Sequence, residues 1–442
     1  MPVLPGQTLE AWLAHLEALH PHGSAGIELG LERVAVVKDR LGQRQTCPLI
    51  LVGGTNGKGS TCALLERILL AAGYRVGLYT SPHLLRYNER VRINAVPADD
   101  DSLCAAFARV EQARNGAALT YFEFGTLAAW EVFAMAKLDA VILEVGLGGR
   151  LDATNIYAPD CAIITGIDLD HMEFLGADRE SIGHEKAGIF RAGVPAICGD
   201  ERPPRSIRAH ADAVGAKLRM IGETFGYQQQ GQQWRYWGQA INDHGQAVDI
   251  VAVDRDGLDM PALRGERQLA NAACALAALD VLRLRLPVAI QDIRRGLREV
   301  ELPGRFEVLS GRPTVILDVA HNPQAARVLA ANLAAMGEHA STWAVFGMLA
   351  DKDIDGVIDA MSGQVSRWLP CALEGRRAAS ADFLAERLHR RGIEVAGRFA
   401  SASAALAWAQ ENADEDDRIL VFGSFLTVAA AMQCLAVQRN HA

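Results

Sequence analysis

The sequence predicts an α/β protein with two domains, each built on a parallel sheet with flanking helices. Short apolar runs rich in Val and Ile alternate with amphipathic stretches from residue 47 onward, as in buried parallel strands joined by helices. A glycine-rich loop, GGTNGKGST (53–61), lies between the first apolar run and the first amphipathic stretch. A second alternation of the same kind begins after residue 305. A chain of 442 residues is long enough for more than one domain.

The first domain is expected to span residues 1–300. The first 20 residues carry Glu10, His15 and Glu17 among apolar positions, so we expect a helix there and not a signal peptide. Residues 60–73 and 124–137 are amphipathic and predict helices. The predicted strands are CPLILV (47–52), RVGLY (75–79), AVILEV (140–145) and CAIITGI (161–167). Residues 225–260 combine polar and aromatic residues with glycines and predict β-hairpins at the edge of this domain.

The second domain is expected to span residues 301–442 and to be a smaller, Rossmann-like α/β unit. A hinge is predicted at Leu302, Pro303 and Gly304, because Pro and Gly interrupt regular structure. The strands predicted after the hinge are PTVILDV (313–319), TWAVFGM (342–348) and DRILVFG (417–423).

Composition excludes several classes of function. The net charge of −9 argues against a nucleic-acid partner, because binding phosphates along a duplex needs clustered Lys and Arg. A membrane span is not expected, since the sequence has no long uninterrupted apolar run. The eight cysteines are scattered without a CxxC pair, which favours reduced thiols in a cytoplasmic protein.

The glycine-rich loop is the strongest candidate for a binding site. It follows a predicted buried strand and opens a predicted helix, which is the setting of a phosphate-binding loop. Glycines allow backbone N–H groups to turn toward one point, and Lys58 is expected to face solvent and to reach the phosphates. Ser60 or Thr61 supplies a hydroxyl suited to Mg²⁺. The alternative is a tight strand–helix turn without a ligand.

Polar residues also follow other predicted strands, where open α/β sheets bind ligands. Glu144 ends one strand, and a carboxylate at that position is suited to binding a metal. The alternative for the loop that follows Glu144 is a structural turn with an Asp–Arg pair. His171 follows the next strand with Asp168 and Asp170 nearby, and offers a metal ligand or a base. Beyond the hinge, Asp318 ends a strand, and the alternative for this segment is a helix cap and turn.

Lys186 lies in the otherwise apolar segment EKAGIF (185–190). A buried lysine loses part of its preference for the charged form, and a neutral amine reacts with CO₂ to form a carbamate, which is an anionic metal ligand. The alternative is a lysine on the helix surface that pairs with Glu185.

These motifs, in this order, resemble the Mur ligase superfamily and, within it, the bacterial bifunctional dihydrofolate and folylpolyglutamate synthases. The resemblance covers nearly the whole chain. Single motifs are weak evidence, but the ordered set is specific. The set is GTNGKGS, TSPHL (80–84), LTYFEFGTLAA (119–129), LEVGLGGRLDATN (143–155), DHMEFLG (170–176), EKAGIF, LPGRFE (302–307), DVAHNP (318–323) and FGSF (422–425).

The resemblance implies an ATP-dependent ligase that adds L-glutamate to dihydropteroate, forming dihydrofolate, and to tetrahydrofolate, forming folylpolyglutamates. The substrate carboxylate attacks the γ-phosphate to give an acyl phosphate, which the glutamate amine then attacks. The implied cofactors are ATP and Mg²⁺, with two ions expected. Positioning and charge neutralisation carry most of such catalysis.

The resemblance also implies roles for particular residues. Those implied in catalysis are Lys58, His171 and Lys186, the last as the carbamylated lysine. Those implied to bind ATP are Gly57, Lys58, Gly59, Ser60 and Asn271, completed by Arg305 and Asp318 when the domains close. The implied metal ligands are Ser60, Ser81, Glu144 and His171. The implied substrate-binding residues are Thr120, Tyr121, Phe122 and Glu123 for the pterin, with Leu151, Asp152 and Ala153 beside them and His321 on the glutamate side.

Two other functions are open from the sequence. A cell-wall precursor ligase of the same superfamily needs an added N-terminal domain, and the phosphate loop begins only some fifty residues into the chain. A nucleotide-binding regulatory protein without catalysis does not need Glu144, His171 and Lys186 together. The chain is expected to act as a cytoplasmic monomer on small-molecule substrates.

Overall fold

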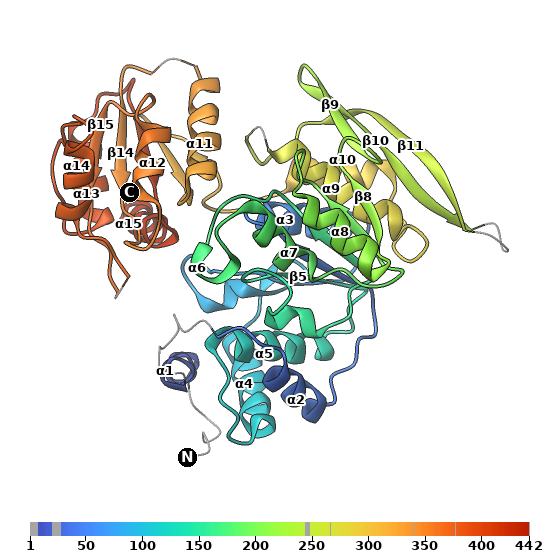
Figure 1. The fold of residues 1–442 in the computed structure, drawn as a ribbon. Helices are drawn as coiled ribbons and strands as arrows, with labels where there is room; N and C mark the ends of the chain where they lie inside the picture. Colours follow the sequence, from blue (N-terminus) through green and yellow to red (C-terminus); the bar gives the residue numbers. More distant parts are fainter. Residues whose placement is uncertain are drawn as a thin grey trace. The chain divides into compact units, whose positions relative to one another are not determined.

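A computed structural model describes residues 8–19, 28–243, 248–265, 267–337, 339–375 and 377–441. The chain forms two compact units (Figure 1). The first comprises the described residues up to His83, with Tyr87–Ala262 and Leu269–Val300; the second comprises Leu84–Arg86, Leu263–Gln268 and the residues from Glu301 onward. In the described part of the chain, none of the helices has the length and apolar character needed to cross a membrane.

The first unit contains an eight-stranded sheet with the order β4-β3-β2-β5-β1-β6-β7-β8. Strands β2, β5, β1, β6, β7 and β8 run parallel, and β3 and β4 form an antiparallel edge. The strand bounds are β1 Leu49–Gly53, β2 Val76–Tyr79, β3 Val91–Ile93, β4 Val96–Pro97, β5 Ala140–Glu144, β6 Cys161–Ile164, β7 Pro195–Cys198 and β8 Lys217–Met220. The predicted first-domain strands are therefore present as β1, β2, β5 and β6, each shortened or shifted by a few residues.

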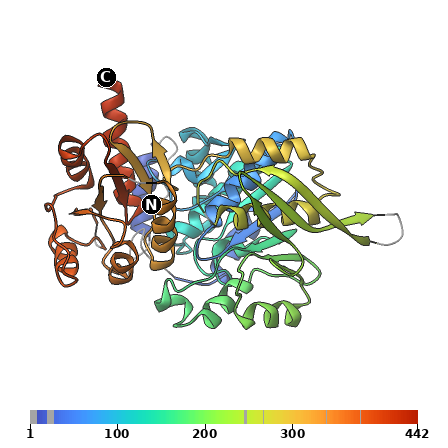
Figure 2. The same ribbon diagram turned by 90° about the horizontal axis from the view of Figure 1, so that it is seen from above.

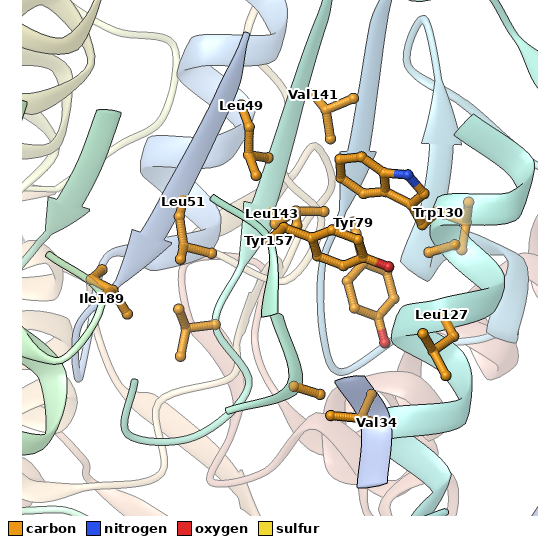
Figure 3. Packing of buried hydrophobic residues seen from close by; sticks show 14 of the residues in the cluster. Val34, Leu49, Leu51, Tyr79, Leu127, Trp130, Val141, Leu143, Tyr157 and Ile189 are labelled. Atoms are coloured by element: carbon orange, nitrogen blue, oxygen red, sulfur yellow. The ribbon is translucent and has the colours of Figure 1, made fainter. Parts of the chain in front are cut away.

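Helices cover both faces of this sheet. Leu49 and Leu51 of β1 pack in one core with residues of α5 (Tyr121–Met135), as Figure 3 shows for Leu127 and Trp130. Ile50 alternates with them and points to the opposite face, where α3 (Lys58–Ala71) contacts β1, β2 and β5. The other helices of this unit are α1 Leu9–Leu19, α2 Glu32–Leu41, α4 Asp100–Arg114, α6 Met172–Leu175, α7 Arg179–Ala187, α8 Arg205–Val214, α9 Gln268–Val281 and α10 Ile290–Glu299, with short 3-10 turns at Tyr87–Arg90 and Ala153–Ile156.

The predicted hairpins form a sheet of their own and do not extend the large one. Strands β9 (Gly226–Gln230), β10 (Gln233–Asp243) and β11 (Val248–Asp259) are antiparallel in the order β11-β10-β9. Figure 2 shows β10 and β11 as a long ribbon that leaves the helical layers, and residues 244–247 of this prediction lie outside the described part. Asp280 of α9 accepts hydrogen bonds from Tyr236 (2.8 Å) and Arg255 (2.5 Å), which fix the ribbon to that helix.

The second unit contains a five-stranded sheet with the order β12-β13-β16-β14-β15, in which β12 is antiparallel. The strands predicted after the hinge are present as β13 (Thr314–Asp318), β14 (Thr342–Phe346) and β16 (Arg418–Phe422). Separate apolar cores lie on its two faces. The remaining elements are β12 Glu307–Leu309, β15 Arg367–Pro370, α11 Pro323–Ala335, α12 Ile354–Met361, α13 Ala381–His389, α14 Ala402–Asn412 and α15 Phe425–His441.

Candidate active site

The phosphate loop follows β1 and is held in shape by close backbone approaches. Gly54 and Gly57 have φ angles of 144° and 92°, in the region that favours glycine. A Cβ on Gly54 would lie 1.9 Å from Oγ1 of Thr165, and one on Gly57 would lie 2.4 Å from Oδ1 of Asn271. The predicted loop residue Gly57 and the predicted nucleotide residue Asn271 are therefore neighbours, although 214 positions separate them in the sequence.

Lys58 is half-buried, and the expectation that it faces solvent was wrong. It is the first residue of α3, and its Nζ donates to the carbonyl oxygens of Gly54 (3.1 Å) and Thr55 (3.2 Å). The side chain turns back because the loop carbonyls are the acceptors within its reach. Lys58 thus lies along the loop, with its charge at the site predicted for phosphate.

Lys186, at the end of α7, is 4% exposed, and its Nζ donates to the same carbonyl oxygen of Gly54 (3.0 Å). Burial and, after it, the positive charge of Lys58 lower the pKa of Lys186 to about 7, while Asp170 and Asp152 oppose the shift. The alternative pairing with Glu185 does not occur, because Arg150 binds that carboxylate (2.8 Å). The lowered pKa favours the neutral amine of Lys186 more than in an exposed lysine.

Glu144 is the last residue of β5, and its carboxylate is buried. Its Oε2 accepts a hydrogen bond from the backbone N–H of Ser81 (3.1 Å), which follows the neighbouring strand β2. Ser60 is buried in the first turn of α3, and the adjacent Thr61 hydroxyl is buried without a hydrogen-bond partner among the described residues. These groups are hard oxygen donors, which suit Mg²⁺.

His171 follows β6 and caps α6, with a positive φ of 50°. Its Nε2 lies 3.9 Å from Oδ1 of Asp170, and its backbone N–H donates to the same oxygen (2.9 Å). Within the described ranges, no group of three or more His, Cys, Asp or Glu side chains is placed to hold a metal. The predicted metal ligands include two residues of these types, Glu144 and His171, and the other two are the serines Ser60 and Ser81. A site of that composition is outside the groups of three described above, so it stays a prediction.

The predicted pterin segment forms the N-terminus of α5. Thr120 and Glu123 make a capping box, in which Thr120 Oγ1 accepts from Glu123 N (3.2 Å) and Glu123 Oε2 accepts from Thr120 N (2.8 Å). Arg33 of α2 also donates to Glu123 Oε2 (2.9 Å). The Glu123 carboxylate is thus bonded within the protein. The T-x-x-E pattern is recognisable in the sequence as a cap, but no sequence pattern relates Arg33 to Glu123, 90 positions away.

The aromatic residues of this segment have different environments. Tyr121 is buried and lies edge-on to Tyr87 at 5.9 Å between ring centroids. Phe124 is fully buried in the core. Phe122 is half-buried, 5.8 Å from Tyr79, and a Cβ on Gly146 would lie 2.6 Å from its ring. Phe122 is therefore the aromatic of the three that is partly accessible.

Asp152 caps a 3-10 turn in the loop after β5, with Leu151 and Ala153 on either side. Its Oδ1 accepts from Thr154 N (2.9 Å) and Thr154 Oγ1 (2.6 Å), and its Oδ2 accepts from Leu147 N (2.9 Å). Burial raises the pKa of Asp152, and these hydrogen bonds oppose the rise. The carboxylate thus shapes the loop, and the roles of these residues toward substrate stay predictions.

In the second unit, Asp318 ends β13 and accepts hydrogen bonds from Phe306 N (2.8 Å) and Ala320 N (2.7 Å). Burial raises the pKa of Asp318, and the charge of Arg305 opposes the rise. The Arg305 guanidinium lies 5.3 Å from the ring centroid of Phe425, and His321 lies 6.0 Å from the same ring. Asp318, Arg305 and His321 are therefore gathered at one end of β13.

Comparison with known proteins identifies the family of this chain. Residues 52–279 match the Mur ligase middle domain, and residues 304–425 match the glutamate ligase domain of Mur ligases. The dihydrofolate synthase/folylpolyglutamate synthase of Escherichia coli is 45% identical over 98% of this chain and 96% of its own length. The corresponding enzyme of Haemophilus influenzae is 40% identical over 95% of this chain and 96% of its own length.

A solved structure of the Escherichia coli enzyme in complex with DHPP and ADP superimposes with a TM-score of 0.89, at 44% identity over 98% of this chain and 99% of that chain. The Mur ligase domain matches span most of both units, and the relatives match nearly from end to end. The chain therefore belongs to the Mur ligase family and, within it, to the bifunctional dihydrofolate synthase/folylpolyglutamate synthases.

Proposed function

We propose that this chain joins L-glutamate to dihydropteroate, forming dihydrofolate, and to tetrahydrofolate, forming folylpolyglutamates, with hydrolysis of ATP to ADP and phosphate. The acceptor carboxylate attacks the γ-phosphate of ATP, and ADP leaves. The glutamate amine then attacks the acyl carbon of the resulting acyl phosphate, and phosphate and a proton leave. The relatives of this family are named for both reactions, and their solved structures hold ADP or an ATP analogue.

The observation that carries the proposal is the meeting of Lys58 and Lys186 at the Gly54 carbonyl in a glycine loop that opens a helix. A loop with the Lys58 ammonium and a helix N-terminus is suited to a polyphosphate. Gly57, Gly59, Ser60 and Asn271 line or adjoin the same loop and are proposed to bind the nucleotide. Lys58 is proposed to neutralise charge on the transferred phosphoryl group.

Lys186 is proposed to act as a carbamate. Its neutral amine attacks CO₂, a C–N bond forms, and one proton is released. A lowered pKa supports this, because the amine must be unprotonated to react. A divalent metal, when bound, supplies positive charge to the phosphate oxygens. The residues proposed to hold it are Ser60, Ser81, Glu144, His171 and the modified Lys186.

The remaining roles follow the division of the chain. The first domain, 1–300, is proposed to bind ATP and the pterin, the latter through Thr120–Glu123 and Leu151–Ala153. The second, 301–442, is proposed to contribute Arg305 and Asp318 to ATP binding and His321 to glutamate binding. We further propose that the protein works as a cytoplasmic monomer without a nucleic-acid partner.

The test is a product assay with purified protein, ATP, Mg²⁺ and L-glutamate. Dihydropteroate and tetrahydrofolate are supplied in separate reactions, and both glutamylated products and stoichiometric ADP are expected. Extension of tetrahydrofolate with dihydropteroate left unchanged at saturation would remove the first activity. ADP release independent of either acceptor would favour the regulatory nucleotide-binding alternative.

A further inference from the structure

A group of hydrogen-bond donors lies beside the predicted pterin segment and has no assigned role. Arg90, from the turn before β3, lies with its Cζ 5.5 Å from the ring centroids of both Tyr87 and Tyr121. Its Nε donates to Nδ1 of His83 (2.9 Å). Among the described residues, no carboxylate lies within ion-pair distance of Arg90, whose guanidinium contacts His83 and the two tyrosine rings.

His83 does not supply a negative charge. An imidazole is neutral or cationic in its ordinary protonation states, so it is not an anionic partner for Arg90. Since its Nδ1 accepts from Arg90, its proton lies on Nε2, and it adds another donor.

Two tyrosine hydroxyls complete the group. Tyr79 and Tyr87 are 0% and 3% exposed, and neither Oη has a hydrogen-bond partner in the described part of the chain. A Cβ on Gly125 of α5 would lie 2.5 Å from Tyr87 Oη and 3.2 Å from Tyr79 Oη, so both hydroxyls point to the same side of that helix. Buried hydroxyls without partners are rare.

The position of this group relates it to the acceptor substrate. The N–H of Thr80 donates to the carbonyl oxygen of Arg90 (2.9 Å), and the next residue, Ser81, is bonded to Glu144. On its other side, Arg90 covers Tyr121, the neighbour of Phe122. The group therefore lies between the proposed metal ligands and the proposed pterin segment. A guanidinium beside two hydroxyls without partners is suited to an anion, and guanidinium binds carboxylates with particular geometric fit.

We propose that Arg90, supported by Tyr79 and Tyr87, forms a subsite that binds a carboxylate of the acceptor substrate. This inference rests on the proposed function for the identity of the acceptor. Two carboxylates are candidates for the same chemistry. The reacting carboxylate is present in dihydropteroate and in tetrahydrofolate, whereas the non-reacting α-carboxylate of the glutamyl residue is present only in tetrahydrofolate.

The test uses Arg90→Gln, Arg90→Lys, Tyr79→Phe and Tyr87→Phe in the full chain. Removing a hydrogen bond to a charged group predicts that Arg90→Gln raises the acceptor KM roughly 10–100-fold with the ATP KM unchanged. Arg90→Lys keeps the charge, so its acceptor KM is expected to lie between those of the wild type and Arg90→Gln. Each Tyr→Phe change is expected to raise the acceptor KM less than Arg90→Gln does. If the KM of Arg90→Gln rises for both acceptors, Arg90 binds the reacting carboxylate. If it rises for tetrahydrofolate alone, Arg90 binds the α-carboxylate.

Arg109→Gln is the matched control, since it removes one arginine from the neighbouring α4, where Arg109 pairs with Glu131. Its acceptor KM is expected to be unchanged. An unchanged acceptor KM in a folded Arg90→Gln protein overturns the proposal. A second outcome also overturns it: Arg90→Gln raises the ATP and acceptor KM values equally and lowers the melting temperature, and Arg90→Lys restores neither. That pattern indicates a structural role for Arg90.

A binding measurement separates this inference from the proposed function. Calorimetric titration with 4-aminobenzoylglutamate, which carries the carboxylates without the pterin, requires no turnover. If the wild-type protein glutamylates neither dihydropteroate nor tetrahydrofolate but binds this compound, and Arg90→Gln abolishes the binding, the subsite is supported and the proposed function is refuted. Normal turnover by wild-type protein, with binding and KM values that do not depend on Arg90, refutes the subsite alone.

Discussion

In both units, polar residues lie at the ends of parallel strands, but the hydrogen bonds that position these residues differ between the units. In the first unit the bonds cross between loops, as when Lys186 reaches Gly54 and the N–H of Ser81 reaches Glu144. In the second unit they stay close to β13 and to the segment just before its neighbour β12. Asp318 accepts from Ala320 N and Phe306 N. His321 Nδ1 lies 2.8 Å from the Val319 carbonyl oxygen. Cross-loop bonds make residues depend on one another, so their substitutions should not combine additively, whereas local bonds should act nearly independently.

The largest expected effect concerns the two lysines. Lys58→Ala and Lys186→Ala should each lower kcat by roughly 10²–10³-fold or more, since each removes a charged group from the phosphate loop. The double variant should be little worse than the poorer single variant, because residues that act as a unit fail together. Steady-state kcat at saturating substrates measures this, with the exposed Lys217→Ala as control. Multiplied losses in the double variant would show that the lysines act separately.

Lys186→Ala offers a further check on the carbamate. A short carboxylate such as acetate or propionate, added to that variant, should restore part of the activity by taking the place of the carbamate. The same additive should not restore Lys58→Ala, whose lost group is a cation. Equal recovery of both variants would argue against an anion at position 186.

Matched carboxylate-to-amide changes compare the two units directly. Glu144→Gln removes a proposed metal ligand at a cross-loop bond and should lower kcat by about 100-fold or more. Asp318→Asn keeps one oxygen for its local hydrogen bonds and should raise the ATP KM by about tenfold. The kinetic constants for ATP in both variants provide the measurement. A larger loss in Asp318→Asn would reverse the comparison.

Lys186 should also reduce stability at neutral pH. Its pKa is about 7 in the folded protein and 10.5 for a free lysine, so the unfolded chain binds more protons between these pH values. The free energy of unfolding should therefore rise with pH across this window. In CO₂-free buffer near pH 8, Lys186→Met should be more stable by on the order of 1–3 kcal/mol, and the difference should shrink toward pH 10. Denaturant unfolding at several pH values measures it.

Lys58→Met should raise the pKa of Lys186, because the charge of Lys58 is one cause of its depression. Carbamate formation requires the neutral amine, so the carbamate fraction should increase with pH, and in the variant this increase should occur at higher pH. The ¹³C NMR signal of protein-bound carbamate in labelled bicarbonate follows the midpoint. An unchanged midpoint would mean that the two amines do not interact.

The smallest expected effect is at the acceptor end. Phe122 is the partly accessible aromatic of its segment. Phe122→Ala should raise the KM for dihydropteroate several-fold, and more than the KM for tetrahydrofolate, because stacking on a ring contributes on the order of 1 kcal/mol. Equal changes for both acceptors would refute the assignment of Phe122 to the dihydropteroate site.

Local patterns were sufficient for much of the fold. The apolar strands are recognisable from short stretches, and Asn322 before Pro323 caps α11 as such a pair predicts. The positions of Glu144 and Asp318 at strand ends follow from the same patterns. Their neighbours along the chain determine these features, so sequence alone was enough.

Contacts between distant residues were harder to predict. The sequence did not show whether Glu185 pairs with Lys186 or with Arg150, which lies 35 positions away. It also did not separate a capping role for Glu123 from a substrate role, since T-x-x-E serves both, and Arg33 lies 90 positions away. The donor group around Arg90 has no sequence pattern because it depends on residues from β2, the turn before β3 and α5 meeting in space.

The shared acceptor at Gly54 has a consequence for calorimetry. An amine that titrates near neutrality, held beside a second cation, changes its proton occupancy whenever a polyanion arrives, because the added negative charge favours the ammonium form. Nucleotide binding to the unmodified protein should then draw protons from the buffer, and the heat released should vary with the ionisation enthalpy of that buffer. Once CO₂ has converted the amine to a carbamate, that buffer dependence should disappear, so the proton count of binding reports the chemical state of a single side chain.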